Sequence, residues 1–322
     1  TELEHYRRVL ATCHEHGLTP MVTFHHVTSP SWLTGDGGWE AEATPDRFGR
    51  FCERAMSYLG DLIPFACTIN EPNLARVLAA VVSLAKDDAE PWWQDAARAA
   101  GGGDSSRFLP FLYASSPRAR HTIMAAHRRC VDAVKSAAGE CSVGVGIALT
   151  AFETAPGGDE AMERLRRSCE DEFLEDVGDV DYVGVQTYTR VRIGPEGTLL
   201  AEEGIERTQM GYEFYPEALE ATIRRAVAVT GVPVIVTENG VATDDDTRRV
   251  EFVERALRGV ERCLRDGIDV RGYFYWSAFD NFEWMLGYRP TFGLIAVDRE
   301  TQERRVRPSA RRLGEIARRN GL

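Results

Sequence analysis

Short, continuously apolar runs alternate along the chain with longer stretches in which apolar residues recur every three or four positions. The first pattern is typical of strands buried on both faces of a sheet, and the second of amphipathic helices. Six strands are predicted, at residues 20–26, 65–71, 143–150, 181–189, 232–239 and 270–279. Five helices are predicted, at 45–59, 116–137, 162–176, 215–229 and 247–265. Regular alternation of this kind predicts parallel βα units.

Polar side chains gather where these predicted strands end. They are His25 and His26, Asn70 and Glu71, Gln186 and Tyr188, Glu238 and Asn239, and Trp276 and Asp280. In a (β/α) barrel the carboxyl ends of the strands carry the active site, because the βα loops converge there. The sequence therefore predicts an α/β fold of the (β/α)8 TIM-barrel type, with residues 1–322 forming a single catalytic domain.

Composition narrows the classes of partner. The formal net charge is −12, which disfavours nucleic acid and anionic membrane surfaces, since both require clustered Lys and Arg. No apolar run approaches the roughly 18 residues that a spanning helix needs. The seven cysteines are scattered and show no CxxC pair, which predicts reduced thiols and a cytoplasmic location. The expected partner is therefore a small, neutral molecule.

Two of the predicted strands end in a glutamate, Glu71 in TINEP and Glu238 in VTENG. Hydrolysis of a glycosidic bond uses such a pair, because one carboxylic acid protonates the leaving oxygen while the other carboxylate attacks or activates water. A separation of about 5 to 5.5 Å gives retention of configuration, and about 6.5 to 9.5 Å gives inversion. The sequence does not measure this distance, so both outcomes stay open at this point.

The run WSAFDNFEW, from Trp276 to Trp284, mixes aromatic rings with Asp280, Asn281 and Glu283. Sugars bind to such mixtures, because their C–H faces stack on rings while carboxylates accept hydroxyl hydrogens. An aromatic core plug is the alternative interpretation. Asn70 adds an amide beside Glu71, either for a sugar hydroxyl or for the turn that ends its strand.

Histidines raise the question of a metal site. His25 and His26 are adjacent on a strand, so their side chains point to opposite faces, and no HxH or HExxH spacing is present. His121 and His127 lie in a predicted helix without a matching acidic set and are interpreted as structural. We therefore expect neither a metal nor an organic cofactor.

Taken together, these motifs resemble glycoside hydrolase family 1, the retaining β-glucosidases and β-galactosidases of the (β/α)8 type. TINEP resembles the acid/base strand of the family and VIVTENG its nucleophile strand, which implies Glu71 and Glu238 as the catalytic pair. FHHVTSP resembles the third strand and implies His26 as a sugar contact. The resemblance further implies Asn70, Tyr188, Trp276, Glu283 and Trp284 as substrate-binding residues.

The chain also departs from the family pattern. Gln186 stands where the family usually has Asn, and Val27 replaces a commonly aromatic neighbour of the pocket histidine. The first predicted strand corresponds to the third strand of the family, so about six βα units are expected and the N-terminal units are expected to be missing. Exposed strand edges are prone to association, which makes a homo-oligomer that covers them a further expectation.

The sequence thus predicts a retaining β-glycosidase that hydrolyses terminal β-D-glucosyl, and also β-D-galactosyl, residues of small β-glycosides. The alternative is a catalytically impaired sugar-binding remnant of the same family, and a third hypothesis is an inverting hydrolase. Residues 85–106 are expected to form a long surface loop, which either borders the site or is an insertion without function.

Overall fold

A computed structural model describes residues 2–82, 90–101, 105–137, 140–199 and 202–322. The chain divides into two compact units. The first comprises Thr1–Ala148 and Arg167–Gly184, and the second Leu149–Arg166 and Val185–Leu322.

A six-stranded sheet has the strand order β1-β2-β3-β5-β8-β9. Its strands are β1 (Met21–His25), β2 (Phe65–Asn70), β3 (Ser142–Ala148), β5 (Tyr182–Gln186), β8 (Val234–Asn239) and β9 (Val270–Tyr275). Each lies inside one of the six ranges predicted from the sequence, apart from the first residue of β3. The parallel pairing is present between β1 and β2, between β2 and β3, and between β8 and β9.

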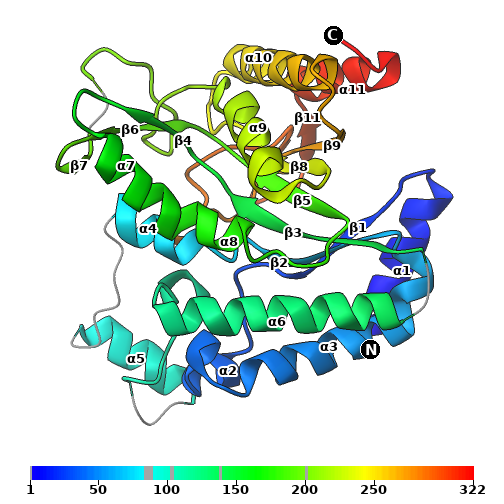
Figure 1. Cartoon of the computed structure of the whole chain (residues 1–322). Coiled ribbons are helices and arrows are strands. Elements are labelled where there is room, and N and C mark those ends of the chain that lie inside the picture. The colour runs from blue at the N-terminus through cyan, green and yellow to red at the C-terminus, as the bar shows by residue number, and fades with distance from the viewer. Residues whose placement is uncertain (1, 83–89, 102–104, 138–139, 200–201) are drawn as a thin grey trace. The chain divides into compact units, whose positions relative to one another are not determined.

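In the first unit two long helices, α3 (Thr44–Leu59) and α6 (Pro117–Ser136), lie side by side (Figure 1). Helix α6 also packs on β2 and β3. It begins with Ser116 as N-cap, whose hydroxyl accepts a hydrogen bond from the Ala119 N–H, and Pro117 fits the first helical position. The unit also contains α1 (Glu2–Glu15), α2 (Ser31–Gly35), η1 (Gly38–Glu40), η2 (Gly60–Leu62), α4 (Leu74–Val81), α5 (Pro91–Ala99), η3 (Phe111–Tyr113), η4 (Arg167–Asp171) and α8 (Glu172–Leu174).

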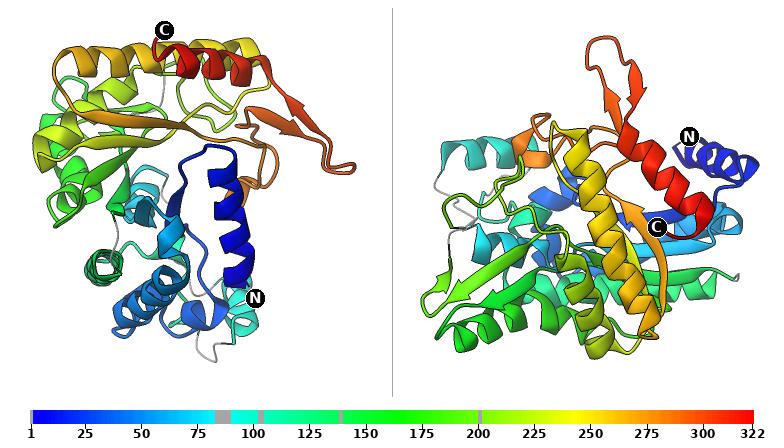
Figure 2. Two further views of the ribbon diagram at one scale, coloured as in Figure 1. Left: turned by 90° about the vertical axis from the view of Figure 1, so that its right-hand side faces the viewer. Right: turned by 90° about the horizontal axis from the view of Figure 1, so that it is seen from above.

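In the second unit α10 (Asp246–Arg265) packs against α9 (Ala218–Thr230) and α11 (Pro308–Arg319), as Figure 2 shows for α10 and α11. Two small sheets were not predicted from the sequence. One joins β4 (Ala151–Thr154), β6 (Arg190–Gly194) and β7 (Gly197–Thr198), and the other is the hairpin of β10 (Ile295–Val297) and β11 (Arg304–Val306). Helix α7 (Asp159–Arg166) and η5 (Trp284–Leu286) complete the unit.

Three expectations need correction. Strands β1 and β9 are not buried on both faces: in β1 only His25 is buried, and Phe274 in β9 is 44% exposed. The helix predicted at 162–176 is interrupted by the π-helical turn η4. Within the predicted loop 85–106, residues 91–99 form α5, whose Trp93 packs on Phe108 in a small apolar cluster. Residues 85–89 and 102–104 of that loop lie outside the described residues.

One glycine fixes how closely β3 and β5 approach each other. A Cβ added at Gly144 would lie 2.5 Å from the Tyr182 ring, so only glycine fits at this position of β3. The Tyr182 hydroxyl donates to the Ala66 carbonyl in β2 at 2.8 Å. The tyrosine thus spans β3 and ties β5 to β2.

His127 connects α6 to the sheet from a fully buried position. Its Nε2 hydrogen-bonds to the Val177 carbonyl at 2.9 Å, and its Nδ1 lies 2.7 Å from the Thr68 hydroxyl. The carbonyl can only accept, so Nε2 donates and Nδ1 accepts from Thr68, which makes the ring neutral. Burial lowers the pKa of His127 to about 4. The structural interpretation of this histidine is thereby confirmed.

The free energy of unfolding should decrease as the pH is lowered, partly because of the His127 ring. An unfolded histidine binds a proton below about pH 6.5, whereas the folded ring binds one only near pH 4, so acidification favours the unfolded state. Between pH 7 and pH 4.5 we expect wild type to lose about 2–3 kcal/mol more unfolding free energy than His127→Gln does. Urea unfolding at both pH values measures this. The exposed His16→Gln is the control, and equal losses in all three proteins would contradict the prediction.

Candidate active site

Glu71 follows the last residue of β2 and has a left-handed backbone conformation, with φ of 48°. This region is unfavourable for a residue with a Cβ, and such strain concentrates at functional sites. The Glu71 N–H donates to the Gly146 carbonyl of β3 at 2.8 Å, and its carbonyl accepts from Leu74 N–H. The backbone of the predicted acid/base is therefore fixed on both sides.

Asn73 is fully buried and supports this turn with its side chain. Its Oδ1 accepts from Ala148 N–H at 3.0 Å, and its Nδ2 donates to the carbonyls of Ala148 and Cys169 at 2.7 and 2.9 Å. The amide thus joins the turn after Glu71 to the end of β3. Sequence reasoning missed this residue, although an Asn directly after Glu-Pro at a strand end is a signal for such a turn.

The two adjacent histidines do point to opposite faces. His25 is buried between the rings of Trp39 and Phe111, with centroids 4.6 and 4.7 Å away, and burial lowers its pKa to about 3. His26 points the other way and places its Nε2 3.4 Å from Asn70 Nδ2. Burial lowers the pKa of His26 as well. The first unit therefore brings together two of the predicted substrate-binding residues, both next to the strand end that carries Glu71.

In the second unit Glu238 lies near the end of β8 and is 8% exposed. Tyr188 Oη donates to Glu238 Oε2 at 2.5 Å. A hydrogen bond of this length from a phenol to a carboxylate favours the charged form of the carboxylate. Phe292 supports the tyrosine from the side, with ring centroids 5.9 Å apart, and is itself 3% exposed. Phe292 was not singled out from the sequence.

The backbone beside Glu238 is held by its neighbour Asn239. Asn239 Nδ2 donates to the Thr187 carbonyl at 2.6 Å, and its Oδ1 accepts from the Tyr273 hydroxyl at 2.9 Å. Thr187 N–H in turn donates to the Glu238 carbonyl at 3.1 Å. Gly240 follows, and a Cβ there would lie 2.0 Å from the Trp276 carbonyl. Glycine at this position therefore permits the end of β8 to approach Trp276 closely. Trp276 begins the segment of residues 276–284, which we call the aromatic loop.

That loop carries Trp276, Glu283 and Trp284, and the residues it exposes include Phe282 at 53%. The pKa of Glu283 is raised because the side chain is buried. The hydrogen bond with Trp276 lowers this pKa but offsets only part of the effect of burial. Trp284 has a left-handed backbone with φ of 44°. The core-plug interpretation does not hold for Phe279 and Phe282 of this run, which are 43% and 53% exposed.

Asp280 anchors the same loop rather than facing a ligand. Its carboxylate forms a two-bond pair with Arg307, with both N–O distances at 2.9 Å, and also accepts from Gly293 N–H at 2.8 Å. The side chains are only 10% and 19% exposed. Gln186, the departure from the family pattern, is 2% exposed at the end of β5.

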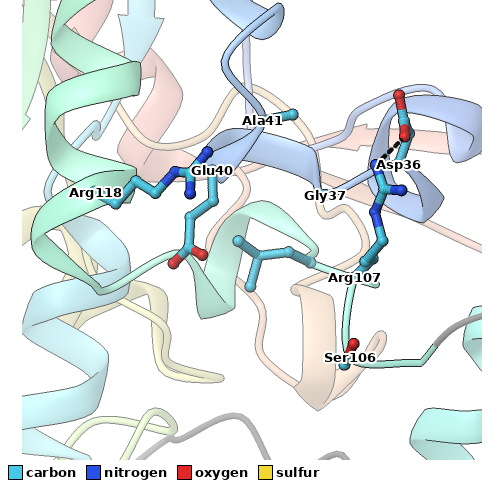
Figure 3. Close-up of a pocket in the computed structure, with 8 residues that line it drawn as sticks. Asp36, Gly37, Glu40, Ala41, Ser106, Arg107 and Arg118 are labelled. Carbon is cyan, nitrogen blue, oxygen red and sulfur yellow. Dashed lines mark hydrogen bonds and ion pairs between the residues drawn. The ribbon is translucent and has the colours of Figure 1, made fainter.

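A separate hollow of about 210 Å³ lies in the first unit (Figure 3). It is lined by Asp36, Gly37, Glu40, Ala41, Ser106, Arg107, Leu109 and Arg118. None of the predicted site residues belongs to it. Its charges are largely used internally, since Asp36 pairs with Arg47 and Arg107, and Glu40 accepts from the Ser116 hydroxyl. We assign it no catalytic role.

Among the residues that the structure describes, no group of three or more His, Cys, Asp or Glu side chains is arranged to hold a metal ion. No helix in the described part of the chain is long and apolar enough to cross a membrane.

Comparison with known proteins decides the family. The pattern of the family described as glycosyl hydrolase family 1 matches residues 1–183 and 185–322. The chain belongs to this family. A β-galactosidase of Sulfolobus acidocaldarius is 30% identical over 99% of this chain and 70% of its own length. β-Glucosidase A of Thermotoga maritima is 26% identical over 99% of this chain and 78% of its own length.

Similar solved structures agree with this assignment. The crystal structure of β-glycosidase BGL167 has a TM-score of 0.94 and 50% identity, over 99% of this chain and 78% of that one. The apo structure of β-glucosidase 1317 has a TM-score of 0.90 and 40% identity, over 99% and 79%. The predicted resemblance and the α/β fold of the TIM-barrel type are thereby confirmed. The roles of individual residues and the single-domain organisation stay predictions.

The pair formed by Asp280 and Arg307 should contribute strongly to stability. Replacing Arg307 with Met leaves a buried carboxylate without its counter-charge, which costs about 3–5 kcal/mol of unfolding free energy. The exposed pair of Arg265 and Glu261 supplies the control, because Arg265→Met should cost less than about 1 kcal/mol. Chemical denaturation measures both. Equal losses would show that Arg307 does not hold the loop.

Proposed function

We propose that this family 1 protein is a retaining β-glycosidase that hydrolyses terminal β-D-glucosyl and also β-D-galactosyl residues of small β-glycosides. Glu238 is the nucleophile and Glu71 the general acid/base. The observation that carries the proposal is the 2.5 Å hydrogen bond from Tyr188 to Glu238, which stabilises a charged carboxylate at a strand end. The names of the relatives, β-galactosidase and β-glucosidase, support the substrate class.

In the first step the Glu238 carboxylate attacks the anomeric carbon while Glu71 donates a proton to the leaving oxygen. The bond to the aglycone breaks and a glycosyl-enzyme ester forms. Glu71, now ionised, then removes a proton from water, which attacks the anomeric carbon and releases Glu238. The strained, doubly anchored backbone of Glu71 supports this role, because proton transfer requires a fixed position.

Sugar recognition is assigned to five of the predicted substrate-binding side chains. His26 and Asn70 supply hydrogen-bonding groups beside Glu71. Glu283 accepts hydroxyl hydrogens, and Trp276 and Trp284 offer ring surfaces for the C–H faces of the sugar. The cysteines are scattered along the sequence and show no CxxC pair, which supports a reducing, cytoplasmic location. No metal or organic cofactor takes part in the proposed reaction.

Release of a nitrophenolate from an aryl β-glucoside tests the proposal. Glu71→Ala and Glu238→Ala should each lower turnover, in the case of Glu238 by about 10⁴-fold or more, because the covalent step is lost. Equal turnover in wild type, Glu71→Ala and Glu238→Ala would refute the assignment of these two glutamates as the catalytic pair. Proton NMR of the first-formed product should show the β-anomer, whereas the α-anomer would indicate an inverting hydrolase.

Azide separates the two roles. In Glu238→Ala, azide enters the space left by the nucleophile and should restore activity with an α-glycosyl azide as product. In Glu71→Ala, azide replaces water at the second step and should give the β-glycosyl azide. If wild type binds glucose in calorimetry without any turnover, the chain is instead a catalytically impaired sugar-binding member of the family.

A further inference from the structure

Tyr188 lies in an irregular segment between β5 and β6, so no strand fixes its position. On its N-terminal side, Thr187 is tied to β8 by the backbone bond to Glu238 and the side-chain bond from Asn239. A tyrosine fixed on one side only could rotate away from Glu238. The segment on the other side, Thr189 and Arg190, is therefore decisive for the geometry of the phenol.

Arg190 makes an unusually complete set of contacts for a residue at the start of a short strand. Its Nε and Nη2 donate to the two carboxylate oxygens of Glu213 at 2.9 and 2.7 Å, and its Nη1 donates to Glu153 at 2.9 Å. The guanidinium also lies over the Tyr215 ring, with its Cζ 4.1 Å from the centroid. Planar, two-bond pairing of this kind fixes orientation as well as position.

Glu213 also binds Thr189, the residue between Tyr188 and Arg190. The Thr189 hydroxyl donates to the Glu213 carbonyl at 2.8 Å. The Arg190 and Glu213 side chains are 21% and 13% exposed, so solvent screens their pair less than it screens a surface pair. Two consecutive residues after Tyr188 are thus attached to Glu213, one through the side-chain carboxylate and one through the backbone.

We infer that Arg190 is a positioning residue for the nucleophile: its pairing with Glu213 and Glu153 holds the segment that aims Tyr188 at Glu238. All three guanidinium nitrogens of Arg190 donate to Glu213 or Glu153, so Arg190 acts through the tyrosine. The inference rests on the proposed function only where turnover is measured, because the position of the phenol can be observed without any reaction.

Arg192 provides a matched control. It lies two residues further along β6, on the same face, and pairs with Glu202, whose side chain is 65% exposed. Arg192→Gln therefore removes the same type of side chain and the same charge from the same strand. It leaves the contacts of Thr189 and Glu213 intact.

The direct test is carbon NMR on protein labelled at Cζ of tyrosine, since this shift responds to hydrogen bonding of the phenol. Tyr188→Phe identifies the signal, and Glu238→Ala defines its position without the acceptor. Arg190→Gln should move the signal part of the way toward the Glu238→Ala position, and Arg190→Lys less far. Arg192→Gln should leave it at the wild-type position. An unmoved signal in Arg190→Gln overturns the inference.

Turnover of an aryl β-glucoside supplies the second readout. Arg190→Gln should lower kcat/KM by about 10- to 100-fold, the scale expected when a catalytic group is slightly misplaced. In a Tyr188→Phe background the same change should have less than about a twofold effect, because the mediating hydroxyl is already gone. Additive losses would overturn the inference. A moved NMR signal with no turnover in wild type would refute the proposed function and leave the positioning role standing.

Discussion

Where a buried strand ends, its last backbone N–H and C=O groups still need partners, and this requirement shapes both halves of the molecule. In the first unit Asn73 pairs with both backbone groups of Ala148 and with the Cys169 carbonyl. In the second unit Asn239 performs the equivalent task for the Thr187 carbonyl. An asparagine amide can donate and accept at once, so it continues the hydrogen-bonding of a sheet after the strands diverge. Each of these residues lies within two positions of a predicted catalytic glutamate.

Arginine side chains extend this support in the second unit. Arg249 is fully buried and donates to the carbonyls of Thr243 and Thr291 at 2.5 and 2.8 Å, which ties the chain after β8 to the residue before Phe292. Arg307 holds the aromatic loop through Asp280. A guanidinium offers five donors in a fixed plane, so one side chain can satisfy several loop carbonyls that no strand reaches. The loops that follow the strands are thereby tied by side-chain hydrogen bonds.

The elements that could be predicted from the sequence are those whose signal is local. All six strands of the main sheet were found because each is a short apolar run, and both glutamates because each directly ends such a run. The small sheet of β4, β6 and β7 was missed, since its strands are short and partly polar. Partners such as Asn73 and Cys169 lie far apart in sequence, and nothing near either residue specifies the other. The contact of Phe292 with Tyr188 was not predicted for the same reason, because the two residues lie far apart in sequence.

A phenol beside Glu238 fits the role of nucleophile that we propose for this glutamate. A cation in direct contact would stabilise the carboxylate more strongly and would also weaken it as an attacking group, since the ion pair must be disrupted as the ester forms. A neutral hydroxyl can stabilise the charge before attack and stay in place as the charge disappears. It does so only if its direction is fixed, because a hydrogen bond weakens steeply with misalignment. The guanidinium of Arg190 lies two residues away in sequence, where its charge is taken up by Glu213 and Glu153 and its rigidity serves the tyrosine.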